Sequence, residues 1–256
     1  MARKAVIVAA GLSSRLYPLT SETPKMLLPI GDETLLGRSM RLLGENGVQD
    51  IAVVVGFRAD SIRKAVGDAA TIIPNPFYRQ CNNMGSLMMA KNYAGNDPFV
   101  YLHGDLVYGE NMLGEFLAQS AQHPGVPRSR EHSRGTTATG SCLDLLVAFG
   151  DVDEEGMKVR AGGDGRLIES NKAIPLNEAA GEWTGIAVVQ KPAIVFEAME
   201  QHMMDVSLTD YDTAAFTTLA QTGHEVRCIA ANNDPWKEID TFEDLEAARA
   251  AFGTSG

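Results

Sequence analysis

The chain has 256 residues, 45% of them hydrophobic, with a formal net charge of −11 and a sequence pI near 4.9. This length can bury a substantial core, and the acidity argues against a general nucleic-acid binder, which needs a basic face. No apolar stretch approaches the roughly 18 residues of a membrane span, and the N-terminal run is too short for an export signal. Three cysteines without metal-ligand spacing indicate reduced thiols. We therefore expect a cytoplasmic protein without membrane or nucleic-acid partners.

The first half of the chain alternates apolar runs with helical patterns. Short apolar runs predict buried strands at residues 4–9, 50–55 and 98–103 and a short strand at 71–73, and periodicity predicts helices at 33–46, 60–66 and 82–93. This alternation favours a mainly parallel sheet with helices on both faces.

The second half is less regular. We predict strands at residues 143–149, 157–161, 166–169, 184–189 and 224–230, and a short strand at 236–240. Helices are predicted at 192–204, 210–222 and from Thr241 onward. A capping box formed with Asp244 opens the last helix. Residues 123–141 are polar and aperiodic, which predicts a flexible surface loop. Its arginines leave a lid over an anion as an alternative: Arg128, Arg130 and Arg134.

The stretch AAGLSSRLYPLTSETPKMLLPIG, residues 9–31, directly follows the first predicted strand. Gly11 permits a close backbone approach, and successive N–H groups in such a turn bind anionic oxygen. Ser13 and Ser14 add hydroxyl donors, while Arg15 brings a planar fork and Lys25 a compact charge. The segment therefore predicts a phosphate-binding loop. The alternative is an ordinary Gly/Ser-rich loop with solvated cations.

Acidic residues occur at two further points. Asp105 follows Gly104 at the end of a buried strand, where ligands bind in open α/β sheets. In Glu238-Ile239-Asp240 the two carboxylates point to the same side of a short strand. Two carboxylates on one face are costly without a cation, and Mg²⁺ combines carboxylates with phosphate oxygens. We predict Asp105 and Asp240 as magnesium ligands, with Glu238 as a third or outer ligand. A helix cap and an ordinary strand end are the alternatives.

Neither a Walker A loop nor a dinucleotide fingerprint occurs after the first strand. The A-A-G-L-S-S-R, P-L-T and P-K segments instead resemble the signature of the nucleoside-triphosphate transferases, the sugar-phosphate nucleotidyltransferases and their cytidylyltransferase relatives. The resemblance implies a Rossmann-like three-layer α/β sandwich with a mainly parallel mixed sheet, of nucleotide-diphospho-sugar transferase type. It implies that Asp105 and Asp240 form the metal pair, and it adds Ala9, Ala10 and Gly104 to the expected nucleotide contacts.

The segment Asn82-Asn83-Met84-Gly85-Ser86-Leu87 resembles the N-N-x-x-S-L of cytidylyltransferases that use phosphocholine or 2-aminoethylphosphonate. Asn82, Asn83 and Ser86 are therefore expected nucleotide contacts, since amides can read a pyrimidine edge. Helix capping by the asparagines is the alternative. The segment from Asp151 to Val159 is a further match to this branch.

Acceptor contacts are expected from a later part of the chain. Lys172 resembles the family's lysine at the acceptor phosphate, and Glu182, Trp183 and Gly185 fall where the family places acceptor contacts. Trp183 could face a quaternary ammonium or belong to the core. An aminophosphonate or a purely anionic phosphonate stays open as the acceptor. We expect His103, in a strand beside the site, to be a packed polar residue.

These features together predict a magnesium-dependent enzyme that transfers CMP from CTP to a small phosphonate or phosphoalcohol and releases pyrophosphate. Arg15 and Lys25 are its expected catalytic residues, Arg15 over the pyrophosphate and Lys25 over the α-phosphate. A sugar-1-phosphate or inositol-phosphate nucleotidyltransferase, or a nucleotide sensor without turnover, is the alternative. We expect one domain over residues 1–256, with a nucleotide-binding half (1–106) and an acceptor-binding, metal-completing half (107–256). A homodimer stays open.

Overall fold

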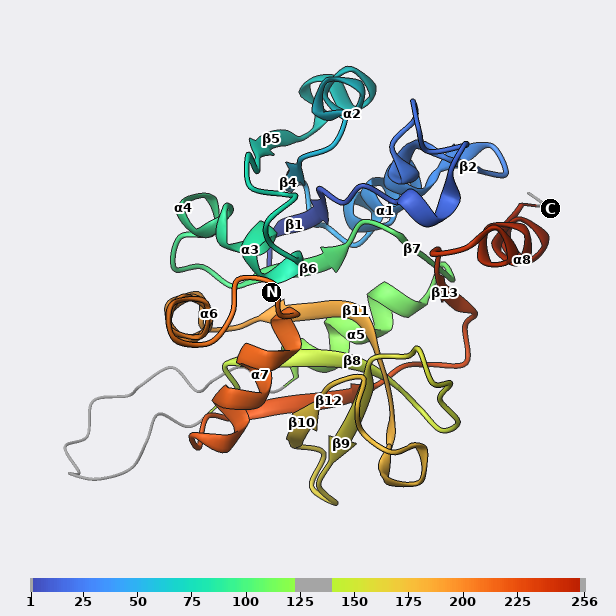
Figure 1. Cartoon of the computed structure of the whole chain (residues 1–256). Helices are drawn as coiled ribbons and strands as arrows, with labels where there is room; N and C mark the ends of the chain where they lie inside the picture. The colour runs from blue at the N-terminus through green and yellow to red at the C-terminus, as the bar shows by residue number, and fades with distance from the viewer. Residues whose placement is uncertain (1, 123–139, 254–256) are drawn as a thin grey trace.

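The computed structural model describes residues 2–122 and 140–253 (Figure 1). Four short apolar segments of the first half form parallel strands in the order β6-β1-β4-β5, with bounds β1 (Lys4–Ala9), β4 (Asp50–Val55), β5 (Thr71–Pro74) and β6 (Phe99–His103). The side chains of β1, β4 and β6 are mostly buried, as expected for strands covered on both faces, whereas those of the edge strand β5 are partly or fully exposed.

The second half extends the same sheet. Within the described residues, the strands that the second half adds to this sheet are β8 (Leu143–Phe149), β9 (Lys158–Ala161), β10 (Leu167–Ser170), β11 (Gly181–Val189) and β12 (Val226–Ala230). β11 runs antiparallel to β6, and β12 lies parallel to β8. The sheet is therefore mixed and mainly parallel, which confirms the predicted fold class. The division of the chain into two functional halves stays a prediction.

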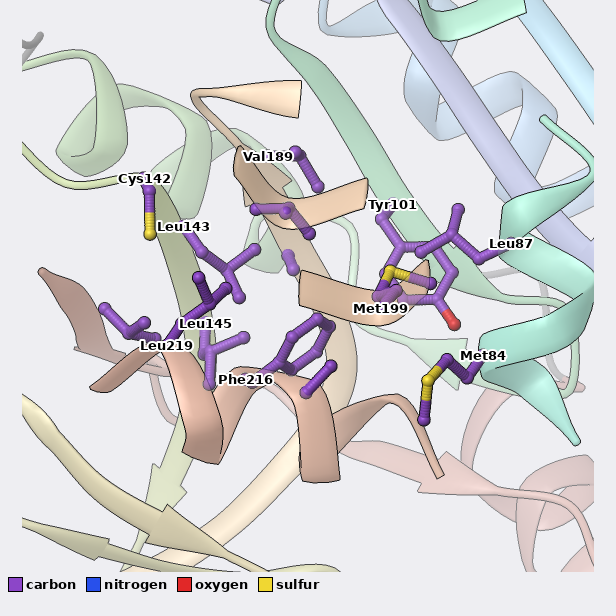
Figure 2. Packing of buried hydrophobic residues seen from close by; sticks show 14 of the residues in the cluster. Met84, Leu87, Tyr101, Cys142, Leu143, Leu145, Val189, Met199, Phe216 and Leu219 are labelled. Atoms are coloured by element: carbon purple, nitrogen blue, oxygen red, sulfur yellow. The ribbon is translucent and has the colours of Figure 1, made fainter. Parts of the chain in front are cut away.

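Helices cover both faces of this sheet. One face is packed by α1 (Leu35–Glu45), α2 (Ala59–Val66) and α5 (Met112–Ala121), and the other by α3 (Asn83–Met88), α4 (Lys91–Ala94), α6 (Pro192–Asp205) and α7 (Asp212–Gln221). Figure 2 shows Met84 of α3, Met199 of α6 and Phe216 of α7 over the strands of the second face. The result is a three-layer sandwich with one apolar core on each side of the sheet.

A third, smaller core joins the start of the chain to its end. It packs Leu16 and Leu28 of the predicted phosphate loop against Ile239 and against Leu245 of α8 (Phe242–Phe252). The strand β13 (Trp236–Glu238) pairs with β7 (Leu106–Tyr108) beside it. Residues about 220 positions apart therefore meet at one edge of the sheet, because their apolar neighbours share a core. The predicted capping box opens α8 and is confirmed.

Two predicted segments, the helix over residues 82–93 and the loop over 123–141, are not confirmed. The helix predicted over 82–93 is divided into α3 and α4, because the N–H groups of Met89 and Ala90 bond three residues back and so tighten the turn. The loop expected at residues 123–141, with its three arginines, lies almost wholly outside the described residues. No described helix combines the length and the apolar character that crossing a bilayer requires.

Candidate active site

A pocket of about 330 Å³ opens where β1 and β6 end. Ligands bind at this edge of open α/β sheets because the strand ends and the following loops leave a crevice there. Most residues predicted for the site line it: Ala10, Gly11, Ser13, Ser14, Arg15, Lys25, Asn82, Asn83, Ser86, Asp105, Lys172, Trp183, Gly185, Glu238 and Asp240. The fold thus brings residues of both halves around one cavity.

The loop after β1 presents its backbone to this pocket. Within the described part of the chain, the N–H groups of residues 11–14 donate no backbone hydrogen bond, so they are available to an anion. The left-handed conformation lies at Ser13 (φ 52°), whose carbonyl accepts from Leu16 N–H and from Thr20 Oγ1 at 2.6 Å. Gly11 has no such φ, and a Cβ there would meet no protein atom within 4 Å. The space beside Gly11 is therefore open to the pocket.

Lys25 is the buried cation of the site, with 5% of its side chain exposed. Its Nζ lies 2.9 Å from Asp105 Oδ2 and 3.1 Å from Asp240 Oδ1. Burial opposes the charge, but the neighbouring carboxylates outweigh it and raise the pKa of Lys25 above its ordinary value. Arg15 contacts the same Asp240 through Nη2, 2.8 Å from Oδ2, yet its side chain is 62% exposed. Asp240 therefore contacts one buried, fixed cation and one that faces solvent.

Backbone pairing fixes the carboxylates opposite Lys25. Glu238 pairs with Leu106, and the N–H of Ile239 donates to the carbonyl of Asp105 at 2.9 Å. The side chain of Ile239 is fully buried in the third core, so Glu238 and Asp240 both face the pocket. The alternation predicted for this strand is confirmed.

The charges of these groups are coupled. The pKa of Glu238 is raised to about 7, first because the surrounding protein removes water from the carboxylate and then because Asp105 and Asp240 are negatively charged. The side chain is nevertheless open to the pocket. Against the effect of burial, the ammonium of Lys25 holds the pKa of Asp105 below its usual range. Asp105 Oδ1 is buried without a hydrogen-bond partner among the described residues. An orphaned carboxylate oxygen beside two further carboxylates fits a divalent cation.

The asparagines at the start of α3 build the opposite wall. Asn82 Oδ1 accepts from the N–H of Asn83 at 2.9 Å. Asn83 Oδ1 accepts from the N–H groups of Met84 and Asp212, and its Nδ2 lies 3.0 Å from His103 Nε2. The asparagines therefore do cap and fasten this helix. Their contacts with a nucleotide stay a prediction.

A buried polar network lies beneath the pocket. Asp212 is fully buried, and its Oδ2 accepts from Tyr101 OH at 2.6 Å and lies 3.3 Å from His103 Nε2. Burial lowers the pKa of His103, but the hydrogen bond with Asp212 and its charge outweigh this and raise it to about 9. His103 is packed, as expected, and it also lines the pocket.

The predicted acceptor residues differ in their surroundings. Lys172 Nζ lies 5.7 Å from the centre of the Tyr211 ring and 3.8 Å from Glu155 Oε2. Trp183 is 3% exposed, and its Nε1 donates to the carbonyl of Ile186 at 3.2 Å. The indole therefore belongs mainly to the core and reaches the pocket with little of its surface. Its contact with an acceptor stays a prediction.

Three predicted site residues do not line the pocket: Ala9, Gly104 and Glu182. Ala9 is buried in the core on the α1 side of the sheet. Gly104 continues the pairing of β6 with β1, and a Cβ there would come within 2.8 Å of Val8 O. Glu182 packs against the loop at Gly156, and burial followed by the charge of Asp153 raises its pKa.

Comparison with known proteins assigns the family. Residues 5–174 match the model of the MobA-like NTP transferase domain. The chain belongs to this family. It is 27% identical over 256 residues to the CMP-5′-(3-aminopropyl)phosphonate synthase of Streptomyces rubellomurinus. This match covers 97% of this chain and 38% of the synthase.

This NTP transferase domain has two further matches, one in sequence and one in fold. It is 34% identical over 120 residues to the choline-phosphate cytidylyltransferase of Streptococcus pneumoniae, covering 46% of this chain and 51% of that protein. The structure of the inositol-1-phosphate CTP transferase from T. maritima superposes with a TM-score of 0.76 at 20% identity, over 99% of this chain and 97% of the other. The chain spans about half or less of the length of the curated relatives it matches first.

Several pocket residues of the NTP transferase domain were not found from the sequence. Tyr78 and Cys81 come from the segment between β5 and α3, and Glu155 and Met157 from the loop before β9. Tyr78 reaches the pocket because Gly56 has no side chain: a Cβ there would come within 2.5 Å of the ring. That close approach joins two loops about 20 residues apart, and no local pattern signals it.

Proposed function

We propose that this protein is a cytidylyltransferase that transfers CMP from CTP to a small phosphonate or phosphoalcohol and releases pyrophosphate. The observation that carries the proposal is the contact of buried Lys25 with Asp105 and Asp240, in a pocket also lined by a loop whose N–H groups at residues 11–14 donate no backbone hydrogen bond within the described residues. A buried cation between carboxylates at a pocket edge suits the charge of a triphosphate bound with a metal.

The reaction needs alignment and charge neutralisation more than proton transfer. An acceptor oxygen, already ionised at neutral pH, attacks the α-phosphorus in line, and the bond from that phosphorus to the bridging oxygen of pyrophosphate breaks. No general base is required. Lys25 would neutralise charge at the α-phosphate, and exposed Arg15 would do so at the departing pyrophosphate.

Asp105 and Asp240, with Glu238 beside them, would hold a magnesium ion. The unpartnered Oδ1 of Asp105 supports this assignment, because a buried carboxylate oxygen needs a partner. When bound, the ion would withdraw charge from the phosphate oxygens. Without the ion, Lys25 contacts Asp105 and Asp240 and Arg15 contacts Asp240, so these cations offset part of the carboxylate charge.

Similar proteins and Lys172 support the choice of CTP and of a small acceptor. The two similar curated proteins are named for CMP transfer to an aminophosphonate and for cytidylyl transfer to choline phosphate. Lys172 offers a charge for the acceptor's phosphoryl group, beside the Tyr211 ring. A cytoplasmic location is part of the proposal, and the three unpaired cysteines support it: Cys81, Cys142 and Cys228.

A pyrophosphate-release assay tests the proposal. Purified protein with magnesium is supplied with CTP, UTP, GTP or dTTP, each against phosphocholine, 2-aminoethylphosphonate, simple alkylphosphonates, inositol-1-phosphate and hexose-1-phosphates. We expect release only with CTP and a small phosphonate or phosphoalcohol. Release with UTP or dTTP and a hexose phosphate would establish the sugar-nucleotide alternative instead. Nucleotide binding without any release would establish a sensor.

A further inference from the structure

We infer that His103 is a ligand of the metal centre proposed above, and that Asp212 orients its ring for this role. The inference rests on that metal centre and changes its chemistry. Carboxylate and phosphate oxygens suit Mg²⁺, whereas an imidazole nitrogen favours first-row transition-metal ions. The centre should therefore bind Mn²⁺ more tightly than Mg²⁺.

The donor atoms of three side chains converge on one point. His103, Asp105 and Glu238 each place one ligand atom so that all three lie within 4.8 Å of one another. Asp240 differs from them, because Arg15 contacts one of its oxygens and Lys25 the other. Asp105 instead keeps a buried oxygen without a partner among the described residues. The carboxylate most available to an ion is thus the one beside His103.

The far side of the His103 ring is already held. Nε2 lies 3.3 Å from Asp212 Oδ2, and in the tautomer whose Nε2–H donates to this carboxylate Nδ1 is the ligand atom. The Asn83 amide, whose Nδ2 lies 3.0 Å from Nε2, donates to the ring only in the other tautomer. A carboxylate behind the ring is the usual arrangement for a metal-bound histidine, because it fixes the tautomer and the ring orientation. Tyr101 OH holds this carboxylate in turn, at 2.6 Å.

The strand β11 leaves Nδ1 accessible. Gly185 has a φ of +81°, and a Cβ on it would come within 3.0 Å of Nδ1. The pairing of β11 with β8 is irregular between Trp183 and Ala187, around this glycine. The indole of Trp183 lies in a T-shaped arrangement with the His103 ring, with 4.8 Å between the ring centroids. The Trp183 indole therefore packs against the ring, and the glycine leaves room beside the nitrogen that would bind metal.

Pulsed EPR on the whole protein with Mn²⁺ alone tests the inference directly. We expect the electron spin-echo modulation of bound Mn²⁺ to contain the ¹⁴N coupling of a directly bound imidazole. Nucleotide is omitted because cytosine nitrogens would give a similar signal. Mn²⁺ bound without a nitrogen coupling overturns the inference, and so does the absence of Mn²⁺ binding at millimolar concentration.

Variants assign the signal to its residue. H103Q should abolish the coupling and weaken Mn²⁺ binding by about 10-fold or more, and D212N should weaken it by about 10- to 100-fold. H202Q is the matched control, because His202 Nε2 forms a similar 2.8 Å contact with Asp210 on the α6 side. A coupling that survives in H103Q overturns the assignment. If H103Q does not fold, D212N assigns the signal: weaker Mn²⁺ binding in D212N but not in H202Q supports the inference, and unchanged binding in D212N overturns it.

The two proposals fail in different ways. Pyrophosphate release with magnesium but no nitrogen coupling leaves the transferase function standing and removes His103 from the centre. A nitrogen coupling without release from any triphosphate keeps His103 as a ligand and removes the proposed reaction.

Discussion

Lys25 and Lys172 line the same pocket but are held in opposite ways. Lys25 is 5% exposed and lies between two carboxylates that are themselves fixed by backbone pairing. Lys172 is 38% exposed, and its neighbours are the exposed Glu155 and the ring of Tyr211. Electrostatic catalysis needs fixed charges, whereas acceptor recognition tolerates adjustable ones. The difference suggests that the transfer chemistry belongs to the rigid sheet edge and acceptor choice to the exposed side.

Replacing Lys25 gives the largest expected effect. K25M keeps the side-chain length but removes the charge, so kcat should fall by about 100- to 1,000-fold with any acceptor. Steady-state kinetics of pyrophosphate release measure it. K91M is the control, because Lys91 forms an exposed ion pair with Glu200 outside the pocket. A near-normal kcat in K25M would show that the fixed charge is not catalytic.

The same substitution at Lys172 should act on binding. K172M should raise the KM for the acceptor by about 10-fold, the value of one hydrogen bond to a charged group, and change kcat and the KM for CTP little. A fall in kcat as large as that of K25M would contradict the division between the two lysines. An unchanged acceptor KM would remove Lys172 from the acceptor site.

Lys158 sharpens the comparison, because it is buried but does not line the pocket. Its Nζ donates to the carbonyls of Glu154 and Lys172, at 2.6 and 3.0 Å, and so ties together two loops of the acceptor side. K158M should lower the free energy of unfolding by about 2 kcal/mol and raise the acceptor KM a few-fold. Denaturant unfolding and kinetics measure the two effects. A change confined to the KM for CTP would show that these loops serve the nucleotide instead.

Local sequence patterns predict the strands and loop that carry the fixed charges of the pocket, whereas side chains placed by contacts between distant segments could not be predicted. The strands β1, β4 and β6 are uninterrupted apolar runs, and the loop after β1 carries its cations within 25 residues of the N-terminus. The alternation in Glu238-Ile239-Asp240 likewise predicts that the two carboxylates point to the same side of the chain, opposite Ile239. Tyr78 and Asp212 had no local signal, because their positions depend on Gly56 and on a network that joins β6 to α7.

The carboxylates of the rigid side should destabilise the metal-free fold. In the folded state the pKa of Glu238 is about 7, above its usual 4.5, so the folded state holds this proton more tightly than the unfolded one. Stability is therefore unaffected below pH 4.5 and is lost as the pH rises towards and past 7. E238Q removes the charge, and after allowance for solvent exposure we expect a gain of about 1 kcal/mol at pH 8. This corresponds to a Tm about 2–4 °C higher for a chain of this size, with no gain at pH 4.

Thermal unfolding of E238Q and the unaltered protein in excess chelator, at pH 4 and pH 8, measures this difference. E243Q, at an exposed position in the first turn of α8, is the matched control and should show no gain at pH 8. Added Mn²⁺ should reverse the order, because the ion stabilises only a site that still has its carboxylate. If E238Q is less stable than the unaltered protein at pH 8 without metal, the carboxylates are balanced by Lys25 and Arg15 alone, and the site has no electrostatic need for an ion.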